Sequence, residues 1–510
     1  MNNNLLFISI ISILFAVLLF NPNLRPNVWD SYEYINTGKA IAQGEGYIQS
    51  WNPDEPRHWR SIGYPLILSL LIYFSDNFIF LKILSLLFYI GNFILVYFMF
   101  SKIFRLPNVI TLIFSLIFSL NQITLTLSNS ILSDTPYLLM QLLSLTLASK
   151  YIYHTRDMSI HSVLIPFFMF ISWQIRSIGL VLILSTFLYF IAQKQYNKSL
   201  LMAGFLTPLI FFVFFFNGSS GGVLDNYNFL STLKNTLFEP QSFIQLIYNG
   251  LTDYFHMIPK SLFGFFYDAM GHFNLHKMAY FSILSFIISL MVIILIILGY
   301  IQLMQSQNLY GYFVPFYIAV LIVYPWNFER AIFPIFPFLL IYFYYGLKLI
   351  IEKLSAILGI EKNNFILKGV CVAILFLSSG EKLYRAFVKN ENIVSLYNNG
   401  ISSYPTEWQN YFMGLFWLKT NIPNNSIVMT RDSSLCYLIS GKKSVSIEDT
   451  KNVNDVKSLL NIQNVDYVIT NSYYKNSHEK FLFEVVKKNP DKFLKVYNSS
   501  NNGVRIFKVV

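Results

Sequence analysis

Long apolar runs with almost no charged residues alternate with short polar segments over most of the chain. Examples are Leu5 to Phe20, Phe78 to Phe100 and Phe281 to Gly299. Each is about 16 to 23 residues long, close to the length of helix that crosses a hydrocarbon layer of about 30 Å. These runs predict membrane-spanning helices. The first is expected to remain as a span, because no small-residue cleavage site follows it.

The apolar runs and the basic loops between them together predict about eleven spans. Lys and Arg concentrate in alternate loops, for example at Lys102 and Arg105, which the positive-inside rule assigns to the cytoplasm. The N-terminus is then expected inside the cell and the C-terminus outside. The expected spans lie near residues 5–21, 78–100, 107–126, 133–150, 160–175, 177–192, 199–216, 279–301, 310–326, 330–347 and 364–380.

One apolar segment, Gly63 to Phe74, is too short for a span, because it has about 12 residues and a spanning helix needs roughly 17 to 25. A crossing there would also reverse the side of every later loop. We therefore expect this segment on or partly within the outer leaflet, which makes residues 22–77 one long outer loop. A second outer loop is expected at 217–278, with an amphipathic stretch from Phe243 to Tyr267 along the membrane surface.

The composition changes from about Glu381 onward, where short β-type runs alternate with helical patterns. The runs lie at Ile427 to Met429, Tyr467 to Ile469, Phe493 to Val496 and Val504 to Val509, and the helical patterns at Tyr411 to Thr420 and Lys480 to Lys487. The chain is therefore predicted to be an α-helical polytopic membrane protein, with a transmembrane domain at 1–380 and an extracytoplasmic α/β domain at 381–510.

The formal charge of +11 comes from 37 basic and 26 acidic residues, yet only 12% of the chain is charged and 55% is hydrophobic. Since the basic residues follow the membrane topology, we expect membrane lipids as partners and no nucleic acid. The expected location is the bacterial inner membrane.

The sequence indicates no cofactor. Its two cysteines, Cys371 and Cys436, form no disulfide framework and no metal cluster. His272 and His276 are four residues apart and so share one face if they are helical, but no third metal ligand is evident nearby.

Ionisable side chains gather at the outer ends of the expected spans and not in mid-membrane. Transfer of a sugar from a polyprenyl phosphate needs a carboxylate that takes a proton from the acceptor, and cations that hold the departing phosphate. The candidate carboxylates are Asp30 and Asp134. The candidate phosphate ligands are Arg60, Arg176 and Arg330, because a guanidinium binds phosphate oxygens bidentately. Accessory candidates are Glu33, Arg57, Tyr64 and Glu329.

Each of these side chains also has a purely structural interpretation, which the sequence leaves open. Asp30 would cap a helix running from Tyr32, and Asp134 would cap a helix with Pro136 in its first turn. Arginines at helix ends commonly reach toward lipid headgroups.

Several of these residues lie in segments that resemble the GT-C glycosyltransferases, in particular the branch of protein O-mannosyltransferases and lipid A aminoarabinose transferases. The segments are DSYEYINTGKAIAQGEGY at 30–47, RSIGYPL at 60–66, SDTPYL at 133–138, RSIGL at 176–180 and ERAIFPIFP at 329–337, with WLKTNIP at 417–423, the strand near Val428, LISGKK at 438–443 and DYVI at 466–469 in the tail. The resemblance covers nearly the whole chain, although each motif is short.

The resemblance implies an outer-face transferase that inverts the anomeric centre, with Asp30 as base, Asp134 orienting Asp30 or the acceptor, and the arginines on the phosphate of the donor. Two departures bear on this. Many relatives have Asp-Glu where this chain has Asp30-Ser31, which leaves Glu33 as the nearest acidic partner, and Lys-Pro-Pro where it has Arg60-Ser-Ile. The sequence identifies neither the sugar nor the acceptor, which could be a glycan, a lipid or a protein.

Two rival functions stay open. A flippase for lipid-linked oligosaccharides or another transporter would need a polar path across the membrane, and the sparse mid-span charge disfavours it. A surface polysaccharide polymerase would use a diphosphate donor and make a ladder of products.

Overall fold

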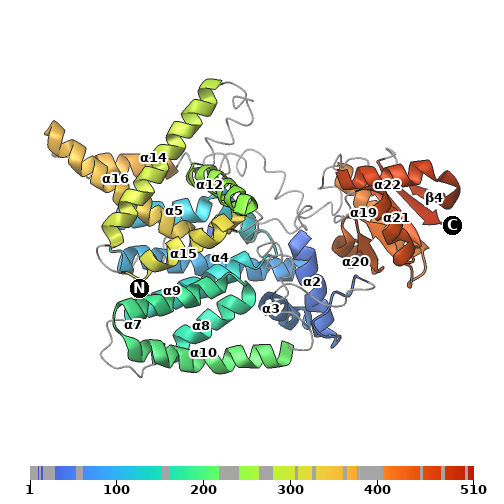
Figure 1. Cartoon of the computed structure of the whole chain (residues 1–510), viewed down its shortest axis with the longest axis horizontal. Coiled ribbons are helices and arrows are strands. Elements are labelled where there is room, and N and C mark those ends of the chain that lie inside the picture. The colour runs from blue at the N-terminus through green and yellow to red at the C-terminus, as the bar shows by residue number, and fades with distance from the viewer. Residues whose placement is uncertain are drawn as a thin grey trace.

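The computed structural model describes most of the helical part and most of the C-terminal part of the chain (Figure 1). The described residues are 10, 13–14, 29–52, 61–151, 160–217, 240–263, 279–304, 308–323, 329–359, 365–375, 378, 404, 406–447, 452–471, 477–499 and 503–510. The expected first span at 5–21 and the expected domain boundary at 380/381 lie largely or wholly outside these residues.

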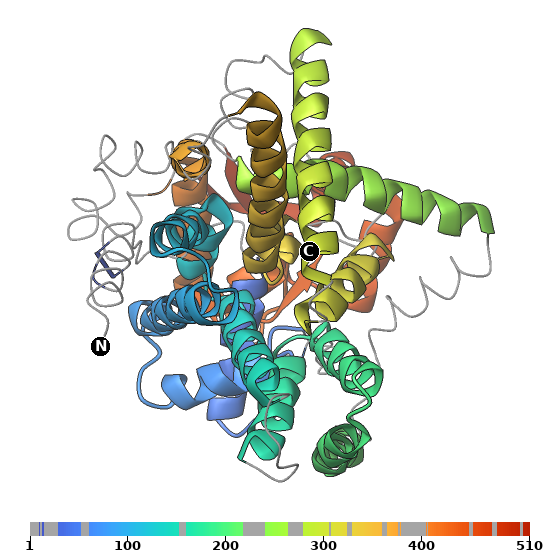
Figure 2. The same ribbon diagram turned by 90° about the vertical axis from the view of Figure 1, so that its left-hand side faces the viewer.

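The part of the chain up to residue 375 is helical where it is described, and Figure 2 views this assembly from the end opposite the C-terminal unit. Its elements are α2 (Trp29–Ala42), α3 (Gly63–Ile72), α4 (Phe78–Phe98), the π-helix η1 (Met99–Ile103), α5 (Asn108–Leu120), α6 (Gln122–Ser128), α7 (Asp134–Tyr151), α8 (Ile160–Ile175), α9 (Gly179–Ala192), α10 (Tyr196–Asn217), α12 (Pro240–Leu262), α14 (Ala279–Met304), α15 (Tyr310–Val323), the 3-10 helix η3 (Glu329–Ile332) and α16 (Phe336–Leu358), followed by an apolar helix at Phe365–Leu375.

Among the described residues, two helices are long and apolar enough to cross a membrane, Phe78–Ile103 and Ile283–Met304. A third span results if the bent pair Asn108–Leu120 and Gln122–Ser128 is counted as one. Large apolar side chains on these helices are exposed, for example Leu87 and Ile287, as lipid-facing positions require. A membrane location follows, while the count of about eleven spans stays a prediction.

The sequence-predicted span at 107–126 is not one straight helix. It bends by 57° between α5 and α6, at Asn121. The Asn121 side chain accepts a hydrogen bond from the backbone N–H of Ile123, which caps α6, and donates to the carbonyl of Ser261 at the end of α12. A polar side chain that starts a new helix therefore breaks the apolar run.

The expected helix start at residue 330 was also wrong. Residues Glu329–Ile332 form a single 3-10 turn, and α16 begins only at Phe336. Pro334 disfavours a helical conformation at Phe333, whereas Pro337 lies in the first turn of α16, where its missing N–H costs nothing.

Helices α14 and α16 cross closely because a glycine lies on each side of the crossing. A Cβ atom at Gly299 would lie 1.8 Å from the carbonyl oxygen of Tyr342, and one at Gly346 would lie 1.9 Å from that of Leu295. Small residues permit such backbone approach in membranes, where apolar burial does not drive helix association.

The C-terminal unit is a five-stranded sheet with helices, at the end of the helical assembly where α2 lies (Figure 1). Its elements are α19 (Thr406–Asn421), β1 (Val428–Thr430), α20 (Ser433–Ser440), β2 (Ser444–Ser446), α21 (Val453–Ile462), β3 (Tyr467–Asn471), α22 (Ser477–Lys488), the 3-10 turn η5 (Pro490–Lys492), β4 (Phe493–Asn498) and β5 (Val504–Val509). The strand order is β2-β1-β3-β5-β4, with β1 parallel to β2 and β3, and β5 antiparallel to β3 and β4. The predicted strands and helices are all present, and β2, α20 and α21 are additional.

Candidate functional site

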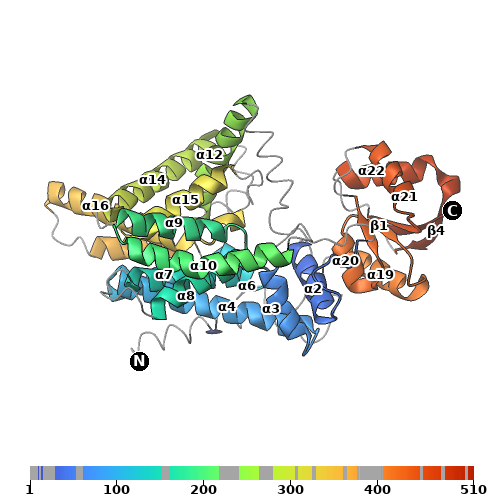
Figure 3. The same cartoon turned by 60° about the horizontal axis from the view of Figure 1, so that its bottom comes forward.

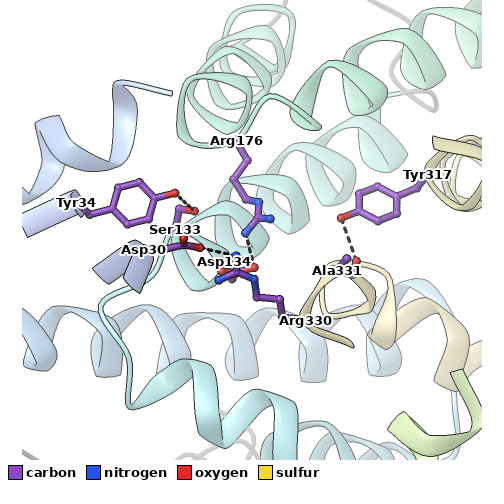
Figure 4. A network of polar contacts seen from close by, with 8 residues as sticks. All are labelled: Asp30, Tyr34, Ser133, Asp134, Arg176, Tyr317, Arg330 and Ala331. Atoms are coloured by element: carbon purple, nitrogen blue, oxygen red, sulfur yellow. Dashed lines mark hydrogen bonds and ion pairs between the residues drawn. The ribbon is translucent and has the colours of Figure 1, made fainter. Parts of the chain in front are cut away.

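Asp30 lies in the first turn of α2, one residue after the helix begins at Trp29, and so does not cap a helix from Tyr32 as the structural interpretation assumed. Its side chain is 18% exposed and forms an ion pair with the Arg330 guanidinium, whose side chain is 31% exposed (Figure 4). Arg330 comes from η3, 300 positions further along the chain.

Asp134 is the first residue of α7 and is 1% exposed, with Pro136 in the first helical turn as expected. It pairs with the guanidinium of Arg176, which directly follows α8 (Figure 4). Burial alone would lower the pKa of Arg176, but the Asp134 carboxylate together with the neighbouring Tyr317, Tyr34 and Tyr137 raises that pKa above its ordinary value.

The two ion pairs lie next to each other because a hydrogen bond joins the elements that carry them. The Tyr34 hydroxyl, on α2, lies 3.0 Å from the Ser133 hydroxyl, directly before Asp134. The Tyr34 ring also packs edge to face on Tyr64 of α3, with ring centroids 5.0 Å apart. In Figure 4 Asp30, Ser133 and Asp134 consequently occupy one small region, with Arg176 and Arg330 reaching it from opposite directions.

The segment that carries Arg330 is held from two sides. The Gln141 amide of α7 donates to the carbonyl of Pro334 at 2.8 Å, and the Tyr317 hydroxyl of α15 donates to that of Ala331 at 3.3 Å. Because both bonds go to main-chain carbonyls, they fix the path of the turn and so the direction of Arg330.

Gly63 brings the start of α3 against the end of α8. A Cβ atom there would lie 2.6 Å from the backbone of Gln174, two residues before Arg176. The glycine of the RSIGYPL segment is therefore required for close packing beside the Asp134–Arg176 pair.

Sequence reasoning missed Lys260, in the last turn of α12, which forms an ion pair with Glu329 next to Arg330. Both side chains are more exposed, at 38% and 42%. It also missed Lys82, which is 1% exposed in the second turn of α4. Lys260 could have been found in the sequence as a basic residue near the end of an amphipathic helix. Lys82 is marked in the sequence only as a charge within an apolar run.

Of the remaining predicted residues, only Glu33 lies within the described part of the chain. Glu33 lies on α2 and is partly exposed. Arg57, Arg60, His272 and His276 lie outside the described residues. Within the described part of the chain, no three His, Cys, Asp or Glu side chains come together as a metal site would need.

Solved structures of glycosyltransferases share this fold. The oligosaccharyltransferase AglB from Archaeoglobus fulgidus, in complex with an inhibitory peptide and a dolichol-phosphate, matches with a TM-score of 0.57 and 12% identity over 98% of this chain and 74% of that one. The apo form of the Archaeoglobus fulgidus oligosaccharyltransferase matches with a TM-score of 0.58 and 12% identity, over 99% of this chain and 74% of that one. ArnT from Cupriavidus metallidurans, bound to undecaprenyl phosphate, matches with a TM-score of 0.51 and 10% identity, over 99% of this chain and 97% of that one.

No protein-family model and no curated protein matches this sequence. The resemblance to GT-C enzymes read from the short motifs is thus confirmed at the level of the fold, over nearly the full length of the chain. At 10 to 12% identity, residue roles do not transfer with it.

Proposed function

We propose that this protein is a membrane glycosyltransferase that transfers a sugar from a polyprenyl-phosphate donor to an acceptor on the extracytoplasmic face, with inversion at the anomeric carbon. The observation that carries the proposal is the pairing of Asp30 with Arg330 and of Asp134 with Arg176, side by side, from four separate elements. The solved relatives in complex with dolichol-phosphate and undecaprenyl phosphate support the donor class.

In the proposed reaction, the acceptor hydroxyl or amine gives its proton to Asp30 as its oxygen or nitrogen bonds to the anomeric carbon. The bond from that carbon to the phosphate oxygen breaks, and polyprenyl phosphate leaves with the electron pair. Charge grows on the departing phosphate, so cations aimed there lower the barrier.

Arg330 and Arg176 supply those cations. A guanidinium has five N–H donors, so Arg330 can hold Asp30 and a phosphate oxygen at the same time. Asp134 keeps Arg176 in place, and Arg60 is proposed as a third phosphate ligand from the same outer loop.

The substrates are identified first, by mass spectrometry of envelope glycans and lipids from cells with and without this chain. Loss of one hexose-sized or pentose-sized unit is expected, and it names sugar and acceptor together. A loss of whole polymer ladders, or no change at all, would contradict a single-addition transferase.

Asp30→Asn then tests the base. The amide keeps the shape of the side chain but cannot take a proton, so transfer by the purified chain in lipid nanodiscs should fall at least about a thousandfold. Asp76→Asn is the matched control, because Asp76 is an exposed partner of Lys39 at 3.7 Å in the same outer loop. An Asp30→Asn variant with near wild-type transfer would remove Asp30 from the base role.

A further inference from the structure

The helix that carries Asp30 is held from the side of the C-terminal domain as well as from the membrane helices. Helix α2 packs on α3 and on α20, and Figure 3 shows α20 beside α2 at the junction of the two parts. On the α20 side, the Asn36 amide donates to the main-chain carbonyl of Ser434 at 2.8 Å. Asn36 is 1% exposed, so this bond is shielded from water.

A second main-chain contact fixes the end of the same segment. The N–H of Ser444, in β2, donates to the carbonyl of Trp51 at 2.7 Å. Strand β2 pairs with β1 through its other edge, where the N–H of Val428 donates to the carbonyl of Lys443. The outer loop therefore covers the free edge of the sheet at this point, and Trp51 is 4% exposed.

A third contact lies between these two. The Tyr437 phenol of α20 is close enough to Glu45 and Ser50 for both to influence its pKa, which burial raises above its ordinary value. Asn36 and Trp51 thus each share a hydrogen bond with the C-terminal domain, through α20 and β2 respectively. The segment 29–52 is clamped at its middle and at its end.

We infer that the C-terminal domain positions the base of the reaction, and that Asn36 is a positioning residue acting on Asp30 through the rigid helix α2. This inference rests on the proposed function. Six residues of helix separate Asn36 from Asp30, about 9 Å at a rise of about 1.5 Å per residue. A tilt of α2 at its docked side therefore displaces the carboxylate from Arg330 and from the acceptor.

Misplacement of a catalytic group by about 1 Å can cost about a hundredfold in rate. The clamp makes no direct contact with the two phosphate ligands whose positions are described, because Arg176 directly follows α8 and Arg330 lies in η3. Loosening it should therefore lower kcat for transfer and leave donor binding unchanged.

Asn36→Ala in the full chain in nanodiscs is the test. We expect kcat to fall at least about tenfold, with KM for the donor and affinity for undecaprenyl phosphate alone within about twofold of wild type. Hydrogen exchange of the α2 amides should become faster, while exchange in α4 and α14 stays the same. Asn489→Ala is the matched control, since Asn489 makes the same kind of bond, amide to the carbonyl of Val485 at 2.8 Å, on the other side of the C-terminal domain.

Tyr437→Phe is a milder second variant, on the α20 side of the clamp, and should show the same kcat-only loss, of about two- to fivefold. An unchanged kcat with faster α2 exchange would overturn the positioning role, as would a loss of protection that spreads to α4 and α14. No transfer by the wild-type chain would overturn the proposed function itself, and the positioning role with it. An active wild type with an unaffected Asn36→Ala variant would overturn the positioning role alone.

Discussion

The helical part and the C-terminal domain both hold acidic side chains away from solvent, but the surroundings of these side chains differ. In the helical part, Asp30 and Asp134 each lie against an arginine. In the C-terminal domain, Asp432 and Glu479 are 6% and 4% exposed, and burial raises their pKa values to about 6 and about 8.

The neighbours explain the difference. Glu479 accepts a hydrogen bond from the backbone N–H of Asn471 at 3.4 Å, and one Asp432 oxygen has no hydrogen-bond partner among the described residues. Burial disfavours the charged form of Asp432 and Glu479 and outweighs the opposing influence of Arg431, whereas Asp30 and Asp134 each form an ion pair with a guanidinium. The helical part thus pairs its acidic side chains with arginines, whereas burial dominates the acidic side chains of the C-terminal domain.

The largest expected effect comes from removing one arginine from the charged region. Arg176→Ala leaves Asp134, which is 1% exposed, without its counter-charge. We expect a loss of roughly 3 kcal/mol or more in unfolding free energy, together with loss of transfer.

Thermal unfolding in detergent measures this change, with Lys39→Ala as the control, because Lys39 and Asp76 form an exposed pair worth under about 1 kcal/mol. If Arg176→Ala and Lys39→Ala lower the unfolding free energy equally, the buried ion pair contributes no more to stability than the exposed one. Arg176→Lys should be intermediate, since it restores charge but not the planar fork.

A change of pH should act on the C-terminal domain in a direction set by Glu479. Its pKa in the folded chain, about 8, lies above its ordinary value of 4.5, so the folded state binds the proton more tightly than the unfolded state. Stability is then greatest below about pH 4.5 and falls as the pH rises toward 8, by up to about 1.4 kcal/mol per unit. Asp432 also lowers stability as the pH rises, between its ordinary pKa of 3.8 and its raised pKa of about 6.

Hydrogen-exchange protection of β3 and α22 in the full chain, corrected for intrinsic rates, measures this dependence. Glu479→Gln should remove most of it and raise protection at pH 8, because the amide oxygen still accepts from Asn471 and carries no charge. Protection that rises with pH in the wild-type chain would show that Glu479 is stabilised as an anion.

The smallest effect is expected from Glu329→Gln, which breaks the ion pair with Lys260 at the rim of the site. Both side chains are more than a third exposed, so water screens the pair and unfolding free energy should change by less than about 1 kcal/mol. Transfer should change by no more than about fivefold. A thousandfold loss would instead place Lys260 or Glu329 among the groups that touch substrate.

The sequence predicted regular elements well where the pattern is long or strongly alternating. The strand expected at Val504 to Val509 coincides with β5, and the short apolar segment from Gly63 is a short helix, α3. Strand β2 was missed because it has three residues, Ser444–Ser446, which is too few for an alternating pattern to show.

The sequence singled out Asp30, Asp134, Arg176 and Arg330 as candidates but not the ion pairs among them, and their roles stay a prediction. Topology suggested Asp30 and Arg60 as neighbours within one loop, which stays a prediction because Arg60 lies outside the described residues; the structure pairs Asp30 with Arg330, 300 positions away. No local pattern reports such a contact, because it depends on how α2, α7 and η3 converge. The bend at Asn121 was hidden for a related reason: its cause is one polar side chain whose partners become visible only in three dimensions.

The main-chain bond from Ser444 to Trp51 also bears on how the protein is made. A strand edge left open is a template for other chains, and here part of that edge is covered by a segment translated almost four hundred residues earlier. Residues 29–52 are therefore already synthesised when the strands of the sheet leave the ribosome. A C-terminal domain expressed without the loop is expected to self-associate through β2, and supplying residues 29–52 in trans should reduce that association.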